Sequence, residues 1–471
     1  MIGRGRASLN GSIHKAFHVA RDAFRAQLWP LPIAGVVLAV LAGVLLPHID
    51  SSVDGDLPGW LDALVFSGDP GASRTVLDAV ASSLITVTAL TFSLTVVTLQ
   101  LASSQFSPRL LRNFTQDLFV QVTLALFLAT FTYSLTVLRV VRSSAESPSV
   151  AFVPRLAVTT SFLLALASVV GLVLFLAHLT RQIRVETMLR NVHFDASVTA
   201  STNLPKRSVD SPPEPPRPSQ PAMVSVASSG FLVHVDQGKL VRLADSLDAV
   251  ISLDREPGEF LVVGTPLASY WRRGGGRITD PDDVAKLRKG VHKAVDIGPE
   301  RTAAQDVGYG LRQLSDVVNK ALSPGINDPT TAVHALGHTA GLLVELMRYQ
   351  LGATTLTGDK DVPRVILAKP TFEKCLDSAI SQPRKYGTSD PMVAASLYQL
   401  LWGLACNAPS QHQMAIADQL ERLQTSIAGE AFDDVERANF TMWHREVIAT
   451  LLRQQDGDDV DPTTDTPAPH S

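Results

Sequence analysis

The stretch LAVTTSFLLALASVVGLVLFLAHL, residues 156–179, decides the fold of the first half of this chain. It contains no Asp, Glu, Lys or Arg, and a helix needs roughly 20 apolar residues to cross the hydrocarbon core of a membrane. Three similar windows precede it, at residues 29–46, 79–101 and 118–138. Backbone groups in lipid must bond internally, so the windows are predicted to be helices despite their many Val and Thr residues. The sequence therefore predicts a four-helix transmembrane domain at residues 29–180.

Basic residues in the flanking loops predict the orientation, because Lys and Arg favour the cytoplasmic side. Five of them precede the first window, and five aspartates then lie between residues 50 and 69. The third loop fits less well, because Arg139, Arg142 and Arg155 would lie outside. We expect a multi-pass membrane protein, with residues 1–28 and the C-terminus cytoplasmic. No small-residue cleavage site follows the first window, so we interpret it as an uncleaved span and not as a signal peptide. Arginines expected to contact membrane lipid phosphates are Arg109, Arg112, Arg181 and Arg184.

The second window is unusual in its density of hydroxyl side chains. On a helix, Thr88, Thr91, Thr95, Thr98 and, further on, Gln105 form one uncharged polar stripe. Such a stripe either lines a water-filled path, where hydroxyls replace part of an ion's hydration shell, or packs closely against other helices. Both interpretations stay open at this point. No ionisable group lies in the middle of any window, which argues against a proton relay.

After residue 180 the pattern becomes that of a soluble domain. Residues 181–221 are predicted to be a juxtamembrane helix at the membrane surface, ending near residue 199, and a linker with seven prolines between residues 205 and 221. Residues 222–298 predict a small β-rich unit, residues 299–455 a helical bundle, and residues 456–471 a disordered acidic tail. The fold class is therefore membrane α-helical plus a cytoplasmic α+β domain. Expected strands are 222–226, 231–235, 249–253 and 260–263, with a short helix at 239–247, and the expected bundle helices are 302–322, 329–351, 372–382, 391–406, 411–427 and 433–453.

The segment KALSPGINDPTTA, residues 320–332, predicts a helix end, a Pro-Gly turn and a new helix with Asp328 as N-cap and Pro329 at its first position. An anion or a carboxylate could dock on the amides that begin the new helix. A purely structural helical hairpin explains the same residues. The loop that would form the docking site comprises Ser323, Pro324, Gly325, Asn327, Asp328, Thr330 and Thr331.

Signals for catalysis, metals and cofactors are weak. His334 and His338 have a spacing that places both rings on one helix face, but neither a glutamate between them nor a nearby cysteine completes a zinc motif. The two cysteines, Cys375 and Cys406, are not expected to form a disulfide in a reducing compartment. The sequence has no phosphate-binding loop, dinucleotide fingerprint or nucleophile elbow, and its net charge of −4 does not indicate nucleic-acid binding. We expect no enzymatic activity, no cofactor and no metal.

Three segments of the chain resemble a bacterial family of predicted membrane proteins designated domain of unknown function 2254. They are SPRLL at residues 107–111, QDVGYGLRQL at residues 305–314, and residues 321–332. Tyr309 stands where phenylalanine is expected in this family, which is a minor departure. The resemblance spans nearly the whole chain. It implies a multi-pass topology in the bacterial inner (plasma) membrane but no activity.

Two classes of function follow. An oligomeric ion channel or transporter with a cytoplasmic regulatory domain is indicated by the hydroxyl stripe and by the direct link between the last window and the cytoplasmic domain. Four helices rarely enclose a path alone, so we expect a symmetric homo-oligomer that passes an ion or a small solute. The alternative is a membrane-anchored sensor or scaffold that binds a protein or a small ligand through its cytoplasmic domain. The direction in which the threonine stripe faces separates the two.

Overall fold

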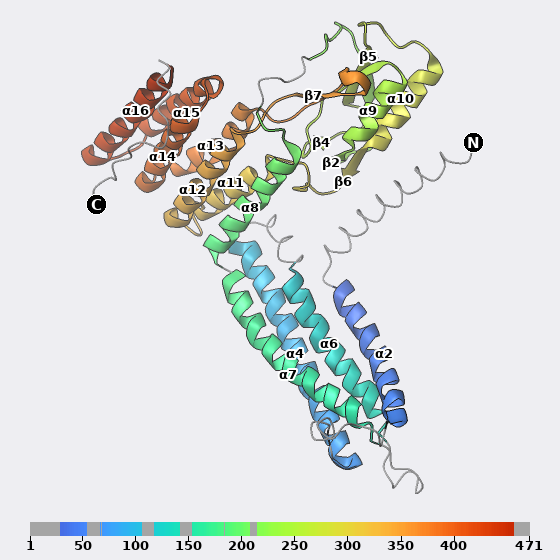
Figure 1. The fold of residues 1–471 in the computed structure, drawn as a ribbon. Coiled ribbons are helices and arrows are strands. Elements are labelled where there is room, and N and C mark those ends of the chain that lie inside the picture. Colours follow the sequence, from blue (N-terminus) through green and yellow to red (C-terminus); the bar gives the residue numbers. More distant parts are fainter. Residues whose placement is uncertain are drawn as a thin grey trace. The chain divides into compact units, whose positions relative to one another are not determined.

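The structure, a computed structural model, describes residues 29–53, 66, 68–105, 117–141, 153–182, 184–207 and 214–455. It consists of two compact units, Met1–Arg184 and Val185–Ser471 (Figure 1). The predicted N-terminal segment, the acidic tail, the SPRLL segment, Arg109 and Arg112 lie outside the described residues.

The described residues of the first unit form four helices, α2 (Pro30–Val53), α4 (Pro70–Gln105), α6 (Leu118–Leu138) and α7 (Arg155–Gln182). All four are long and apolar enough to cross a membrane. Each contains one of the predicted windows, but α4 starts at Pro70 and is therefore longer than predicted. Helix α6 packs against the other three helices, and Figure 1 shows α2 on one side of it and α4 and α7 on the other.

Hydroxyl groups pair between α6 and α7 in the interior of this unit. The Ser134 and Ser161 hydroxyl oxygens lie 2.7 Å apart, and those of Thr130 and Ser168 lie 3.2 Å apart. All four side chains are buried, beside large apolar residues such as Phe127. Small and hydroxyl side chains allow helices to approach closely where both partners are apolar. The interior of the first unit is thus a close-packed helix interface.

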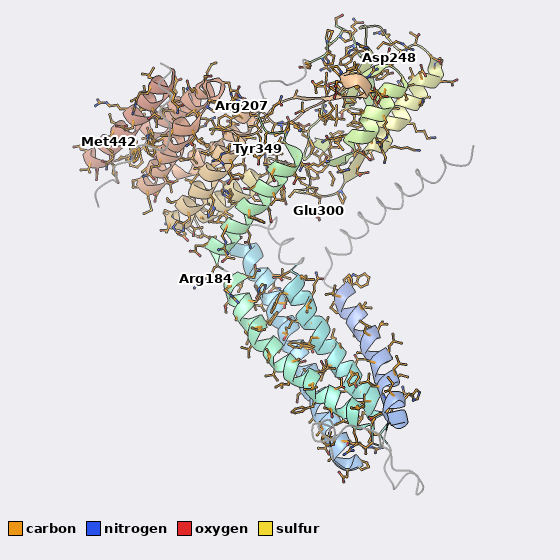
Figure 2. All side chains as sticks on the ribbon, in the orientation of Figure 1. Arg184, Arg207, Asp248, Glu300, Tyr349 and Met442 are labelled. Carbon is orange, nitrogen blue, oxygen red and sulfur yellow. The ribbon has the colours of Figure 1, made fainter. Side chains whose placement is uncertain are left out.

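The second unit begins with α8 (Val185–Asn203). The sequence predicted a helix at the membrane surface here. In the structure, α8 packs against α11 (Tyr309–Ala321) and α12 (Pro329–Leu346). Its apolar face, which includes Leu189 and Val192, is buried. Past its end, the Gln350 amide donates to the Pro205 carbonyl over 3.0 Å and the Arg207 amide to the Arg348 carbonyl over 3.2 Å, and Figure 2 shows Arg207 beside Tyr349. The helix is therefore a core element of the second unit.

Two sheets occupy the described part of the second unit. The larger has the order β1-β5-β3-β8-β7, with β3 and β8 parallel and its other pairs antiparallel, and the smaller has the order β4-β2-β6. Strands β7 and β8 come from the region predicted to be purely helical, so the sheet and the bundle do not separate at residue 298. The strands are β1 (Ala222–Ser225), β2 (Gly230–Val235), β3 (Ala249–Leu253), β4 (Phe260–Leu261), β5 (Pro266–Arg272), β6 (Val295–Gly298), β7 (Thr354–Thr357) and β8 (Pro363–Leu367).

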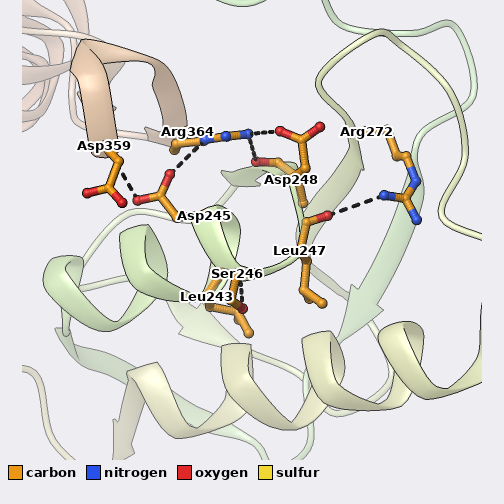
Figure 3. Close-up of polar contacts among 9 residues, drawn as sticks. Leu243, Asp245, Ser246, Leu247, Asp248, Arg272, Asp359 and Arg364 are labelled. Carbon is orange, nitrogen blue, oxygen red and sulfur yellow. Dashed lines mark hydrogen bonds and ion pairs between the residues drawn. The ribbon is translucent and has the colours of Figure 1, made fainter.

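A buried arginine attaches β8 to the neighbouring α9 (Gln237–Ser246) and to the turn that follows it (Figure 3). Arg364 Nε donates to Asp245 Oδ1 over 2.8 Å, and its Nη1 donates to Asp248 Oδ1 over 2.7 Å. The Arg364 side chain is only 10% exposed. Its hydrogen bond lowers the pKa of Asp248 despite the opposing effect of burial. Two carboxylates on one guanidinium hold the late strand in a sheet formed mainly by earlier residues.

The remaining helices confirm the helical periodicity read from the sequence. Helix α11 starts seven residues later than predicted, at Tyr309, because residues 301–308 form turns and irregular backbone. Helix α10 was not predicted. The bounds are α10 (Pro281–Ala294), α13 (Phe372–Gly387), α14 (Pro391–Asn407), α15 (Ser410–Ala428) and α16 (Asp434–Gln455), with a short 3-10 turn at Asp359–Asp361.

Candidate functional site: a charged cleft in the second unit

An open cleft of about 520 Å³ lies in the second unit. Three stretches distant in the sequence line it: the turn at residues 256–259, the segment at residues 301–312, and the start of α13 with Pro370 before it. Ligand pockets typically enclose roughly 300–1,000 Å³, so the cleft has room for a small molecule.

The turn Glu256-Pro257-Gly258-Glu259 forms one wall. The Glu259 amide donates to the Glu256 carbonyl over 3.1 Å, and Gly258 has φ +91°. Proline at the second position and a positive φ at the third are typical of a type II turn. Hydrogen bonds with Leu232 join the turn to β2. A Cβ atom on Gly258 would overlap the Asp306 carboxylate and lie 2.8 Å from Arg301 Nε, so only glycine fits here.

The second wall contains a buried ion pair. Arg301 Nε donates to Asp306 Oδ2, and the Arg301 guanidinium carbon lies 5.8 Å from the centre of the Tyr309 ring. The Asp306 side chain is 4% exposed. Burial raises the pKa of its carboxyl, although the Arg301 hydrogen bond and charge and the Gly308 amide act in the opposite direction. The carboxylate lies at the start of α11, where a negative charge is favoured by the helix dipole.

The third wall presents Lys374, which bridges two carboxylates of the turn. Its Nζ donates to Glu256 Oε2 over 2.7 Å and to Glu259 Oε1 over 3.3 Å. Burial alone would lower the pKa of Lys374, but the two glutamates raise it overall. Thr371 caps α13 by accepting from the Lys374 amide over 3.3 Å. The lysine therefore joins the helix to the turn across the cleft.

The cleft has the chemistry of a binding site. Its wall carries charges of both signs beside the polar side chains of Ser378, Ser381 and Gln382. Cys375 also lines it, but burial raises the pKa of this thiol to about 12, so it is a poor nucleophile. Among the described residues, no group of three or more His, Cys, Asp or Glu side chains could hold a metal ion. The arrangement suits a small charged solute held by ion pairs and hydrogen bonds.

The threonine stripe lies elsewhere, in the first unit. Thr88, Thr91, Thr95 and Thr98 are 8%, 2%, 7% and 2% exposed, on the face of α4 that packs against α6 and α7. The Thr88, Thr95 and Thr98 hydroxyls donate to carbonyls of their own helix over 2.6–2.9 Å. Gln105 is the last residue of α4. Burial within a single subunit favours the packing interpretation for these four threonines.

The loop before α12 uses its own carboxylate to begin the helix. Asp328 accepts from the Thr331 amide over 3.0 Å and from its hydroxyl over 2.6 Å, and the hydroxyl bond is the main reason why the pKa of Asp328 is lowered. Asn327 has φ +50°. The predicted cap at Asp328, with Pro329 first in the helix, is confirmed. A carboxylate already lies where an anion would dock, so the geometry favours the structural hairpin. The exposed residues of the loop are Pro324, Gly325, Ile326, Asn327 and Thr330, while Ser323 is half-buried and its hydroxyl donates to the Lys320 carbonyl.

The two histidines of α12 take part in a contact with α8. The ring centroids of His338 and His193 lie 5.5 Å apart, and His193 Nε2 lies 3.1 Å from Glu345 Oε1. His334 is exposed on the same helix. Arg181 and Arg184, at the end of the first unit, are exposed, and neither lines the cleft.

Sequence reasoning missed the cleft. It quoted residues 305–314 as a characteristic segment, but nothing in the sequence places them beside Lys374. The one available signal was Asp306 in the characteristic segment, because an aspartate within a helical pattern can mark a later helix start.

Comparisons with known proteins give a family but no activity. The model of the family described as predicted membrane protein, domain of unknown function 2254, matches residues 25–402. An uncharacterized protein of Mycobacterium bovis is 34% identical over 425 residues, which cover 88% of this chain and 79% of that protein. An uncharacterized protein of Mycobacterium tuberculosis strain H37Rv has the same identity and coverage. No solved structure matches the chain significantly.

Proposed function

This chain belongs to the family of predicted membrane proteins designated domain of unknown function 2254, and we propose that it is a membrane-anchored receptor whose second unit binds a small charged solute in the cleft. The observation that carries the proposal is the cleft itself, with fixed charges of both signs supplied by three separate segments. A solute with an anionic and a cationic group would find a partner for each on these walls.

The cleft is directly connected to α8. The segment at residues 301–308 lines the cleft through Arg301, Asp306 and Gly308, and the carbonyls at Ala303 and Ala304 in the same segment accept from the Thr199 hydroxyl and the Asn203 amide, each over 3.0 Å. A side chain on Gly310 would overlap Ala196 of α8, so the two helices are in close contact. A solute that moved this segment would also move α8.

This connection gives the receptor a route for its signal. Helix α8 starts at Val185, and α7, the last apolar helix, ends at Gln182. We infer that both termini face the cytoplasm of the bacterial inner membrane, that Arg181 and Arg184 meet lipid phosphates there, and that solute binding is read out through α8. Whether the receptor is a homo-oligomer follows from a mass measurement in detergent.

The test is a thermal-shift measurement on the purified full chain in detergent micelles. Glutamate, citrate, glycine betaine and spermidine serve as probes at millimolar concentration. A probe at about 100 times its Kd raises the free energy of unfolding of the protein by about 2.7 kcal/mol. This raises the melting temperature by about 5–10 °C in a unit of this size. We expect at least one probe to do so.

A cleft-filling variant makes the test specific. Ser378→Tyr places a ring in the cleft, and Gln424→Tyr adds the same ring to an exposed position of α15. The shift should vanish in the first variant and persist in the second. A shift that persists in both, or no shift with any probe, would count against the cleft as the binding site.

An oligomeric ion channel or transporter is the second candidate, and one observation favours it. The Thr91 hydroxyl is buried and has no hydrogen-bond partner among the described residues, which a passing water or ion would supply. Ion flux into liposomes tests this idea. Thr91→Val should change the flux, whereas Thr88→Val, whose hydroxyl is bonded to its own helix, should not. Absence of flux from the wild-type protein would leave the receptor as the better proposal.

A further inference from the structure

A second, smaller pocket adjoins the cleft, because Pro257 and Pro370 line both. Its volume is about 30 Å³. Since a single water needs roughly 10–15 Å³ by this measure, the pocket holds about two or three heavy atoms. Apolar side chains, including Val235, Leu253 and Val307, form much of its wall. No Asp, Glu, Arg or His is among its lining residues, and Lys369 is the one charged group there.

The Lys369 amine is held by a backbone carbonyl. Lys369 follows β8 in the chain, and its Nζ donates to the carbonyl oxygen of Asn203 over 2.8 Å. Asn203 is the last residue of α8. Among the described residues, no carboxylate forms an ion pair with Lys369, in contrast to Lys374, which has two. Burial lowers the pKa of Lys369 to about 8. A substantial fraction of this amine is therefore uncharged near neutral pH.

We propose that Lys369 is a covalent capture site for a short-chain aldehyde, which it binds as a Schiff base. A desolvated lysine in an apolar pocket is the usual form of an amine nucleophile. Its nitrogen attacks the carbonyl carbon, a C–N bond forms, and the carbonyl oxygen leaves as water. The product takes one proton from solvent to become the iminium ion.

The pocket accommodates this product. The iminium nitrogen keeps one N–H, which can still donate to the Asn203 carbonyl, and the carbonyl end of α8 favours the positive charge. The small volume restricts the carbonyl compound to about two carbons beyond the amine. None of the charged residues of the cleft lines this pocket, so the proposal does not depend on the solute proposed for the cleft.

Reductive trapping followed by peptide mass spectrometry tests the proposal. The full chain in detergent micelles is treated with acetaldehyde and sodium cyanoborohydride at pH 7.5, which converts a Schiff base into an N-ethyl lysine. The neutral fraction of Lys369 should be about 200-fold larger than that of an ordinary lysine. Less basic nucleophiles are intrinsically slower, which leaves an expected rate advantage of about tenfold.

Other residues of the chain supply the controls. Lys374, paired with two glutamates, and Lys239, paired with Asp236, should label about tenfold more slowly than Lys369. Hexanal should not show this preference, because it exceeds the pocket. Lys369→Arg, which removes the amine, should leave the labelling of the other lysines unchanged. Equal labelling of Lys369 and Lys374 by acetaldehyde, or protection of Lys369, would overturn the proposal, whatever the thermal-shift probes show for the cleft.

Discussion

Replacing Gly258 by alanine should test how the cleft is constructed. Gly258 is the third residue of the type II turn, with φ +91°. A Cβ atom there would overlap the Asp306 carboxylate and lie 2.8 Å from Arg301 Nε. Gly264 is a matched control, because it has φ +85° in a neighbouring turn and its Cβ atom would meet nothing within 4 Å. Both substitutions strain the backbone, but only one disturbs the ion pair.

The expected cost of each substitution follows from these contacts. A left-handed conformation costs an alanine about 1 kcal/mol, and Gly264→Ala should lose little more than that. In Gly258→Ala the turn must also move away from Asp306 or break its pair with Arg301. Separating a buried carboxylate from its partner costs about 3–5 kcal/mol, and Asp306 is only 4% exposed. Allowing for partial relaxation, Gly258→Ala should lose about 4 kcal/mol in total.

Thermal unfolding of the full chain in detergent micelles measures the difference. At about 2–4 °C per kcal/mol for a unit of this size, Gly264→Ala should melt about 3 °C below the wild-type protein and Gly258→Ala about 10 °C below it. If the two variants melt within about 3 °C of each other, the Arg301–Asp306 pair does not constrain the turn and the reasoning fails.

Three further outcomes are expected. Arg364→Leu, which removes a 10%-exposed guanidinium from Asp245 and Asp248, should lower the melting temperature by several degrees, whereas Arg422→Leu, at an exposed pair, should change it little. Burial lowers the pKa of His338, so below about pH 6.5 the unfolded chain binds a proton that the folded chain does not. The contribution of His338 to folding stability should therefore be full above about pH 6.5 and decrease below it. His338→Gln should flatten a profile of melting temperature measured between pH 7.5 and 5.5. A maleimide should label Cys406 in the native protein and spare buried Cys375, which peptide mass spectrometry would show; equal labelling would contradict the assigned burial.

Local signals explain why most helices could be predicted. Asp328 and Asp390 each cap a helix that has proline next in the chain, and a cap followed by proline needs no tertiary contact to be recognised. Strand β8 had no such signal. Its residues pair in parallel with β3, more than a hundred positions earlier, and Arg364 holds it there through Asp245 and Asp248. A strand stabilised by distant partners cannot be read from its own composition.

The same reasoning explains why the cleft was missed. Lys374, Glu256 and Asp306 are ordinary charged residues in the sequence, and each could have lain in solvent. They form a site because the turn, the 301–308 segment and α13 meet in the second unit. Sequence spacing predicts which residues share one helix face, but it does not predict which separate elements come together. The candidate site was therefore accessible only from the fold.

The threonine stripe shows a different limit. In a membrane helix, an uncharged polar face must avoid lipid, so the sequence predicts that Thr88, Thr91, Thr95 and Thr98 face something other than lipid. In the structure all four are buried. A water-filled path and a packed neighbour both satisfy that requirement, and the spacing of the threonines is identical in the two cases. The hydrogen bonds distinguish them better. Three hydroxyls donate to their own helix, as packing allows, and Thr91 alone among the four has no partner. One hydroxyl is a narrow basis for a pore, which is why the charged cleft, with several fixed ion pairs, supports the stronger proposal.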